Sequence, residues 1–220
     1  MRLLAMACLG LGLCRAQEPI FNPETLSADG SLPSFGVTVV DTAGLRGQVY
    51  LIREGSLWLP NFKKLKPVGS LYTTSLNISP RSFTEGFPGV TDRFEWFAID
   101  YTGRFWIEKP GKYQFALLSD DGSTLYIDNK TVIDNDGVHP PRVLFATVKL
   151  SGGIHNIRVS YFQGPRTLLA LMLGVAEAGE KQFRIFDTRE FRPPKNPADW
   201  KYGTPTDLQD PADPKSPRPK

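Results

Sequence analysis

The sequence predicts an all-β protein: a two-sheet antiparallel β-sandwich followed by a proline-rich C-terminal tail. Among its 220 residues, 20 are glycine and 19 are proline, and aromatic residues make up 11 %. So much glycine and proline is unusual for a helical protein, and large aromatic side chains are typical of β cores. Short apolar segments recur about every ten residues without helical periodicity between them, which favours a sandwich.

The predicted strands share runs of β-branched and aromatic residues that are bounded by turn residues. They cover residues 37–40, 48–53, 94–101, 104–107, 113–117, 125–127, 131–133, 143–150, 154–162 and 168–175. Thr102-Gly103 is interpreted as a turn between two of them, and residues 128–130 as a tight hairpin. Residues 61–88 are read as loops around a few short strands, and residues 183–186 as one last strand.

Residues 113–117 show the period-two alternation of a half-buried strand, and the same alternation predicts the core. A slip of one residue would turn every core side chain outward, so the alternation also fixes the register. The side chains expected to face the core are Tyr113, Phe115, Leu117, Leu125, Ile127, Ile157 and Val159.

Four segments are expected along the chain: a signal peptide (1–16), an N-terminal extension (17–36), the sandwich (37–178) and a mostly extended tail (179–220). Arg2 precedes an apolar run over residues 3–13, which is too short to span a bilayer, and cleavage is expected after Ala16. The alternative, a lipid anchor at Cys14, is disfavoured because bulky Leu13 precedes it. The protein is therefore expected to be secreted, periplasmic or on the cell surface.

The tail contains eight prolines between residues 189 and 220. Proline cannot donate to a sheet, and the few apolar residues cannot offset the entropy of ordering. Little regular structure is therefore expected there, with Trp200 and Tyr202 as anchors on a partner or on the sandwich itself.

Composition and motifs argue against several functions. The net charge of +3 and the lack of long basic runs disfavour nucleic acid as a partner. No second apolar stretch follows the first, so no membrane span is expected. The sequence contains none of the common catalytic motifs, so a protein that is not an enzyme is predicted. His139 and His155 lack the spacing of metal ligands and are expected to form hydrogen bonds in loops or at strand ends.

One cluster of polar residues suggests a site. Asp120 and Asp121 follow the alternating strand and precede Gly122, and adjacent carboxylates repel each other unless a positive charge lies between them. One interpretation is a Ca²⁺ site, because Ca²⁺ takes oxygen ligands from such loops. The simpler alternative is that the two aspartates belong to an ordinary solvated turn. Residues 134–137 form a further oxygen-rich loop, and Gln163 ends another strand with an amide oxygen.

Residues 109–135 (KPGKYQFALLSDDGSTLYIDNKTVIDN), His139 and residues 153–162 (GIHNIRVSYF) occur in an order that resembles the protective-antigen-type (PA-14) sandwich family. The resemblance is dense over residues 94–175. It implies a two-sheet sandwich used in carbohydrate recognition, adhesion or assembly. In the lectins of this family, paired aspartates that are often joined by a cis peptide bind Ca²⁺, which contacts sugar hydroxyls.

The resemblance also implies particular site residues. Asp120, Asp121 and Gln163 are the expected calcium ligands, although Gln163 stands where many lectins have asparagine. The residues expected to contact carbohydrate are Gly122, Gln163, Gly164 and Arg166. Three aromatic residues nearby in the sequence, Trp96, Tyr126 and Phe162, are expected to belong to the core rather than to a sugar site.

Two functions follow as hypotheses. The first is a secreted module for Ca²⁺-dependent recognition of a glycan or cell-wall polysaccharide. The alternative is a structural or assembly module of the cell envelope, whose tail docks a protein partner without binding sugar.

Overall fold

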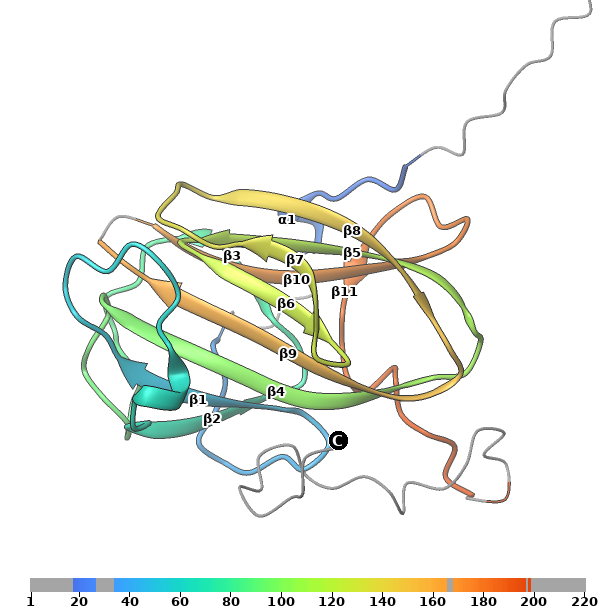
Figure 1. Cartoon of the computed structure of the whole chain (residues 1–220), viewed down its shortest axis with the longest axis horizontal. Coiled ribbons are helices and arrows are strands. Elements are labelled where there is room, and N and C mark those ends of the chain that lie inside the picture. The colour runs from blue at the N-terminus through green and yellow to red at the C-terminus, as the bar shows by residue number, and fades with distance from the viewer. Residues whose placement is uncertain (1–17, 27–33, 166–167, 197, 199–220) are drawn as a thin grey trace, which may run out of the picture.

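The computed structural model describes residues 18–26, 34–165, 168–196 and 198, and this part of the chain is built almost entirely of strands (Figure 1). The strands are β1 (Leu45–Leu51), β2 (Gly69–Thr73), β3 (Asn77–Arg81), β4 (Phe97–Ile107), β5 (Gly111–Asp120), β6 (Ser123–Ile127), β7 (Lys130–Asn135), β8 (Arg142–Leu150), β9 (Gly153–Gln163), β10 (Leu169–Glu177) and β11 (Arg184–Ile185). Two short helices accompany them, α1 (Pro23–Leu26) and the 3-10 helix η1 (Phe62–Lys64). The signal-peptide and lipid-anchor expectations lie outside the described residues.

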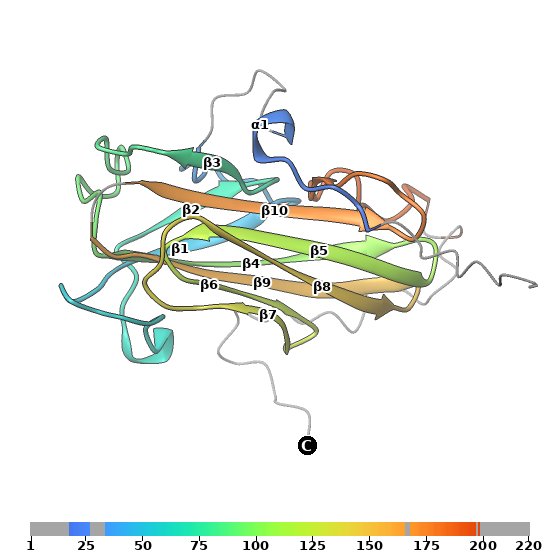
Figure 2. The ribbon, with the colours of Figure 1, turned by 90° about the horizontal axis from the view of Figure 1, so that it is seen from above.

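The strands form two antiparallel sheets, which overlap in the view of Figure 2. A six-stranded sheet has the order β2-β1-β4-β9-β6-β7, and a five-stranded sheet has the order β11-β10-β5-β8, with β3 also pairing β10. The predicted sandwich is therefore confirmed. No helix in the described ranges has the length and apolar character needed to cross a bilayer.

The core lies between the two sheets and contains the side chains that the alternation predicted. All seven predicted core residues belong to one buried cluster, and Tyr113, the most exposed of them, is 4 % exposed. The hairpin over residues 128–130 is also confirmed, because Asp128 and Asn129 adopt the left-handed backbone conformation that such a tight turn requires.

The predicted turn at Thr102-Gly103 is wrong. Both residues lie inside β4, which pairs continuously with β9 from Phe97 to Ile107. A Cβ atom at Gly103 would lie 2.7 Å from Cδ2 of Leu45. Glycine is present here because a neighbouring side chain packs against the backbone, and not because the chain turns.

The strand predicted over residues 37–40 is also wrong. Val37 makes a single bridge to Tyr72, and the next three residues are not in a strand. Val39 and Val40 are largely exposed, so a β-branched run here has no sheet to cover.

The outer face of the five-stranded sheet is covered over β5 and β10, which corrects the expectation that β5 is half-buried. Phe21 and Leu26, near α1, pack against Ala116 and Met172 of this sheet, and Figure 2 shows α1 outside β10. Every residue of β5 from Phe115 to Asp120 is therefore buried. Residues of the predicted N-terminal extension thus contribute to the packing of the sandwich.

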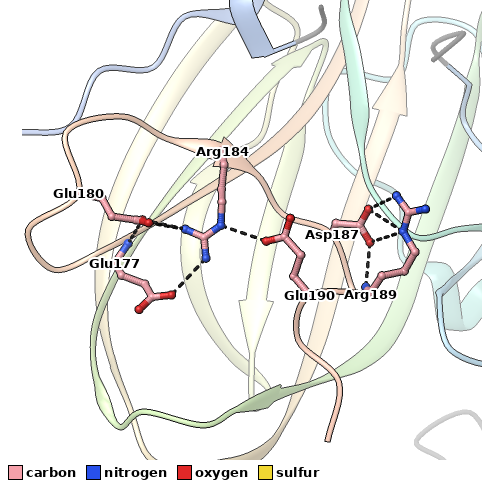
Figure 3. A network of polar contacts seen from close by, with 6 residues as sticks. All are labelled: Glu177, Glu180, Arg184, Asp187, Arg189 and Glu190. Carbon is pink, nitrogen blue, oxygen red and sulfur yellow. Dashed lines mark hydrogen bonds and ion pairs between the residues drawn. The ribbon is translucent and has the colours of Figure 1, made fainter. Parts of the chain in front are cut away.

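The chain continues to pack against the sandwich after residue 178. Phe183, Phe186 and Phe191 are buried, and Arg184 forms ion pairs with Glu177, Glu180 and Glu190 (Figure 3). These carboxylates are 40–51 % exposed, so each pair contributes only about 0.2–1 kcal/mol. The expected behaviour of the tail beyond residue 198, including Trp200 and Tyr202, concerns residues outside the described ranges.

Candidate functional site

Two adjacent carboxylates lie where the chain crosses from one sheet to the other. Asp120 is the last residue of β5, and Ser123 is the first residue of β6 in the opposite sheet. Asp121 and Gly122 connect them, and the Asp120–Asp121 peptide bond is cis. The end of β5 and the start of β6 lie at the left of Figure 1, where the segments after β1, β7 and β9 also gather.

Asp121 is held by two loops. Its Oδ1 atom accepts a hydrogen bond from the backbone N–H of His139 (3.1 Å), and its Oδ2 atom accepts one from the N–H of Gly164 (2.8 Å). Burial raises the pKa of Asp121, while these two N–H groups lower it. The carboxylate thereby joins the loop after β7 to the loop after β9.

Asp120 has a different environment. Its side chain is buried, and no donor among the described residues hydrogen-bonds to its carboxylate, although the residue is only 6 % exposed. Burial, together with the neighbouring Asp121 carboxylate, raises the pKa of Asp120 to about 6. A buried carboxylate without a donor is costly, so this position favours either a proton or a cation.

Gln163 lies beside the aspartates, and its amide is already engaged. The Tyr161 hydroxyl lies 2.7 Å from the backbone oxygen of Asp120 and 2.6 Å from Oε1 of Gln163. The Nε2 atom of Gln163 donates to the carbonyl oxygens of Pro165 and Leu168, at 3.3 and 3.2 Å. Gln163 therefore anchors the loop after β9, and its assignment as a calcium ligand stays a prediction.

Two glycines border the pair, one where a larger residue does not fit and one where it would fit tightly. A Cβ atom at Gly122 would lie 2.4 Å from Cε1 of Phe162 and 2.8 Å from the backbone nitrogen of Gly137. At Gly164 it would lie 3.0 Å from Oδ2 of Asp121. The sugar-contacting roles of both glycines stay predictions, and Arg166 lies outside the described residues.

A loop far away in the sequence also reaches this end of the sandwich. Oδ1 of Asp136 accepts hydrogen bonds from the N–H groups of Leu59 (2.9 Å) and Gly137 (2.8 Å). These bonds hold the segment after β1 against the loop after β7. Trp58, the residue before Leu59, packs against Gly137. Local patterns gave no signal for this contact, because it joins residues nearly 80 positions apart.

Beneath the site, a buried polar network ties four strands together. The hydroxyls of Ser119 (β5) and Ser123 (β6) lie 2.7 Å apart, and Nδ2 of Asn135 (β7) donates to Ser119 at 2.9 Å. Nε of Arg142 (β8) donates to Oδ1 of Asn135 at 2.6 Å. The strands that carry the aspartates are therefore fixed by hydrogen bonds as well as by packing.

The two histidines act as hydrogen-bonding groups, as predicted. The ring nitrogens of His139 lie 2.9 Å from the carbonyl oxygens of Pro140 and Asn135. His155 lies between Asp128 and Ser151, an order that resembles a serine-hydrolase triad. However, its Nε2 atom is closer to the Ser151 carbonyl (3.0 Å) than to the Ser151 hydroxyl (3.4 Å). The nearer partner of Nε2 is therefore the backbone carbonyl oxygen of Ser151 and not its hydroxyl.

The site leads to a prediction about pH in calcium-free buffer. The pKa of Asp120 is raised from 3.8 to about 6 by folding, so the folded state holds the proton more tightly than the unfolded state. The protonated Asp120 side chain therefore contributes to the stability of the fold at low pH, and this contribution is lost as pH rises from about 4 to about 6. We expect a fall of about 1–3 kcal/mol in the free energy of unfolding. Urea denaturation across this pH range should show this fall in the free energy of unfolding of the wild type and a smaller fall in Asp120→Asn. Equal pH profiles for the two proteins would contradict the prediction.

Within the described residues, no third His, Cys, Asp or Glu joins the pair to form a metal-binding group. Any further protein ligand among them is therefore an amide, hydroxyl or backbone oxygen. Such an all-oxygen set suits Ca²⁺ and does not suit Zn²⁺.

The family assignment rests on the residues that contain this site. Residues 79–184 match the PA14 domain family. The chain carries a PA14 domain. The match extends from β3 to β11 and includes Asp120, Asp121 and Gln163. The segment that contains Trp58 and Leu59 precedes the matched residues.

Several solved structures share the PA14 fold. A PA14 sugar-binding domain from an RTX adhesin is 20 % identical, with a TM-score of 0.55 over 66 % of this chain and 96 % of that one. The PA14 domain of the antifreeze protein MpAFP is 17 % identical, with a TM-score of 0.54 over 71 % and 94 %. The epithelial adhesin 9 A domain from Candida glabrata, in complex with Galβ1-3GlcNAc, is 15 % identical, with a TM-score of 0.50 over 71 % and 92 %. Among curated proteins there is no significant match.

Proposed function

We propose that this PA14 protein is a secreted, non-enzymatic module that recognises glycans with the help of calcium held at Asp120 and Asp121. The observation that carries the proposal is the buried carboxylate pair, in which Asp120 has no hydrogen-bond donor among the described residues. The likeness to a sugar-binding PA14 domain and to an adhesin domain crystallised with a disaccharide supports the carbohydrate part of the proposal.

The donor set fits a calcium ion. The Asp120 carboxylate accepts no hydrogen bond from the described residues and could coordinate the ion, and Asp121 keeps lone pairs beyond the two that accept from His139 and Gly164. The Gln163 amide oxygen, which accepts from Tyr161, retains one further lone pair. When bound, calcium would supply coordination positions that exchange water for sugar hydroxyls, because its shell takes six to eight oxygens. The chain would hold the ion, exclude water on the buried side and orient the loop after β9.

A glycan array tests this proposal. The full-length secreted chain is applied with calcium and, in parallel, with a chelator. We expect glycan-dependent retention that disappears with the chelator and returns when calcium is restored. Retention that is equal in both conditions, or absent in both, would contradict the proposal.

The alternative, an assembly module that docks a protein, is supported by a different surface. A groove of about 770 Å³ lies between β1, β4 and residues 188–195, far from the aspartates along β4. Among the described residues that line it, four are cationic, Arg46, Arg104, Arg192 and Lys195, and one is acidic, Asp41. This balance of charge fits an acidic protein partner. The alternative predicts that charge reversal at Arg46 and Arg104 abolishes partner binding, and that the wild type retains no glycan with or without calcium.

A further inference from the structure

An exposed tryptophan lies at the same end of the sandwich as the aspartates. Trp58 is 64 % exposed, and its neighbour Leu57 is 59 % exposed. Of the described aromatic side chains, Phe145 is also largely exposed, but it lies on β8 beside Phe21 and Phe183 on the outer face of the other sheet. Large apolar side chains exposed at the rim of a polar site often mark a binding surface.

The loop that carries Trp58 is fixed and does not need a ligand to hold it. Leu59 and Phe62 pack against a buried cluster that contains Tyr50 and Ile52. The N–H of Leu59 donates to Oδ1 of Asp136 at 2.9 Å. Because its following residue is anchored in this way, Trp58 presents its ring at a defined position, which lowers the entropic cost of binding.

Contacts place the indole next to the carboxylate pair. A Cβ atom at Gly137 would lie 3.2 Å from Cζ3 of Trp58, so the edge of the ring covers this glycine. The backbone nitrogen of Gly137 lies against Gly122, the residue after Asp121. Two residues later, the N–H of His139 donates to Oδ1 of Asp121. The residues from Gly137 to His139 therefore connect the indole to the aspartates.

The three aromatic residues singled out from the sequence are less exposed than Trp58. Phe162 is fully buried, and Trp96 is half-buried, because it packs against the same buried cluster as Leu59 and lies beside Gly164. Tyr126 lies beneath the guanidinium of Arg158, 5.0 Å from its ring centre. Trp58 is thus more exposed than any of these three, at 64 %.

We propose that the Trp58 indole is a platform on which a pyranose ring stacks while its hydroxyl groups reach the Asp120–Asp121 site. This inference rests on the proposed function and names its ligand class: cyclic sugars that present an apolar C–H face. Acyclic polyols offer similar vicinal hydroxyls without such a face. A polar anchor combined with one aromatic surface orients a ligand that is polar at its edge and apolar on its face.

Titration of the full-length chain in calcium buffer tests the inference. The probes are methyl β-D-galactopyranoside and methyl β-D-glucopyranoside, with D-mannitol as the acyclic control. Trp58→Ala is expected to weaken binding of the better pyranoside about tenfold and to leave mannitol binding unchanged. Trp58→Phe, which keeps a ring, should give an intermediate affinity. Leu57→Ala, in the same loop, and Phe145→Ala, an exposed ring elsewhere, should bind like the wild type.

The outcomes separate the two proposals. Pyranoside affinity that is unchanged in Trp58→Ala, while binding still requires calcium, would overturn the platform and leave the proposed function standing. An equal loss for pyranoside and mannitol would assign Trp58 to the geometry of the aspartate site instead, which also overturns it. If the wild type binds none of the probes with calcium, the platform fails, and the glycan array alone decides the proposed function.

Discussion

Asp120→Asn is expected to abolish calcium binding while stabilising the metal-free protein, whereas Asp121→Asn is expected to abolish binding and weaken the fold. The difference follows from their surroundings. The Asp120 carboxylate is buried without a donor among the described residues, so removing its charge relieves a cost of about 1–3 kcal/mol at pH 7. Asp121 accepts from two backbone N–H groups, and an asparagine amide would set its NH₂ against one of them. That substitution should cost about 1–2 kcal/mol.

Thermal or urea denaturation of the two variants, with calcium and with a chelator, checks this prediction. In the wild type, calcium at ~100 times its dissociation constant should add about 2.7 kcal/mol if only the folded state binds. Neither variant should show this increment. If both variants lose the same stability and the wild type does not respond to calcium, the aspartates form an ordinary structural turn.

Gly122→Ala is expected to destabilise the protein by about 1–3 kcal/mol or more and to eliminate calcium binding. The added methyl group would meet the Phe162 ring at 2.4 Å and the backbone of Gly137 at 2.8 Å. A backbone atom cannot move aside as a flexible side chain can, so the turn that carries both aspartates must shift. The measurement is the melting temperature together with the calcium increment.

Gly111→Ala is the matched control for this substitution. A Cβ atom at Gly111 meets nothing closer than the Lys109 carbonyl oxygen at 3.8 Å, so this change should be almost neutral. If Gly122→Ala proved as stable as Gly111→Ala and still bound calcium, the close packing around the turn would be refuted.

The alternation of apolar and polar residues along the strands was enough to predict much of the fold. Phe115 and Leu117 are buried because apolar side chains at every second position must share one face of a strand. The hairpin at Asp128 followed from turn chemistry in the same way. Both features depend on residues close together in the chain, which the sequence displays directly.

Features that depend on distant contacts were not predicted. Gly103 resembles a turn residue in the sequence, but Leu45 from another strand explains it. The outer face of β5 is buried because Phe21, about a hundred residues earlier, packs against that sheet. No local pattern distinguishes a glycine that ends a strand from one that accommodates a distant side chain.

In the candidate site, too, the features that depend on neighbouring residues were predicted and those that depend on distant contacts were not. Asp120 and Asp121 were identified from an adjacent pair at a strand end and from the family resemblance, and the structure buries them together. The contact of Trp58 with Gly137 could not be anticipated, because two loops meet there only after both sheets have formed. The engagement of Gln163 by Tyr161 likewise depends on the folded geometry of β9.

The most direct test of the central claim is a calorimetric titration of the strongest array glycan into the wild-type chain, with calcium and with chelator, and into Asp120→Asn with calcium. We predict binding with calcium, no binding with chelator, and no binding to the variant even though that variant is folded. Glycan affinity that is the same in all three titrations would contradict a calcium-mediated site at Asp120 and Asp121.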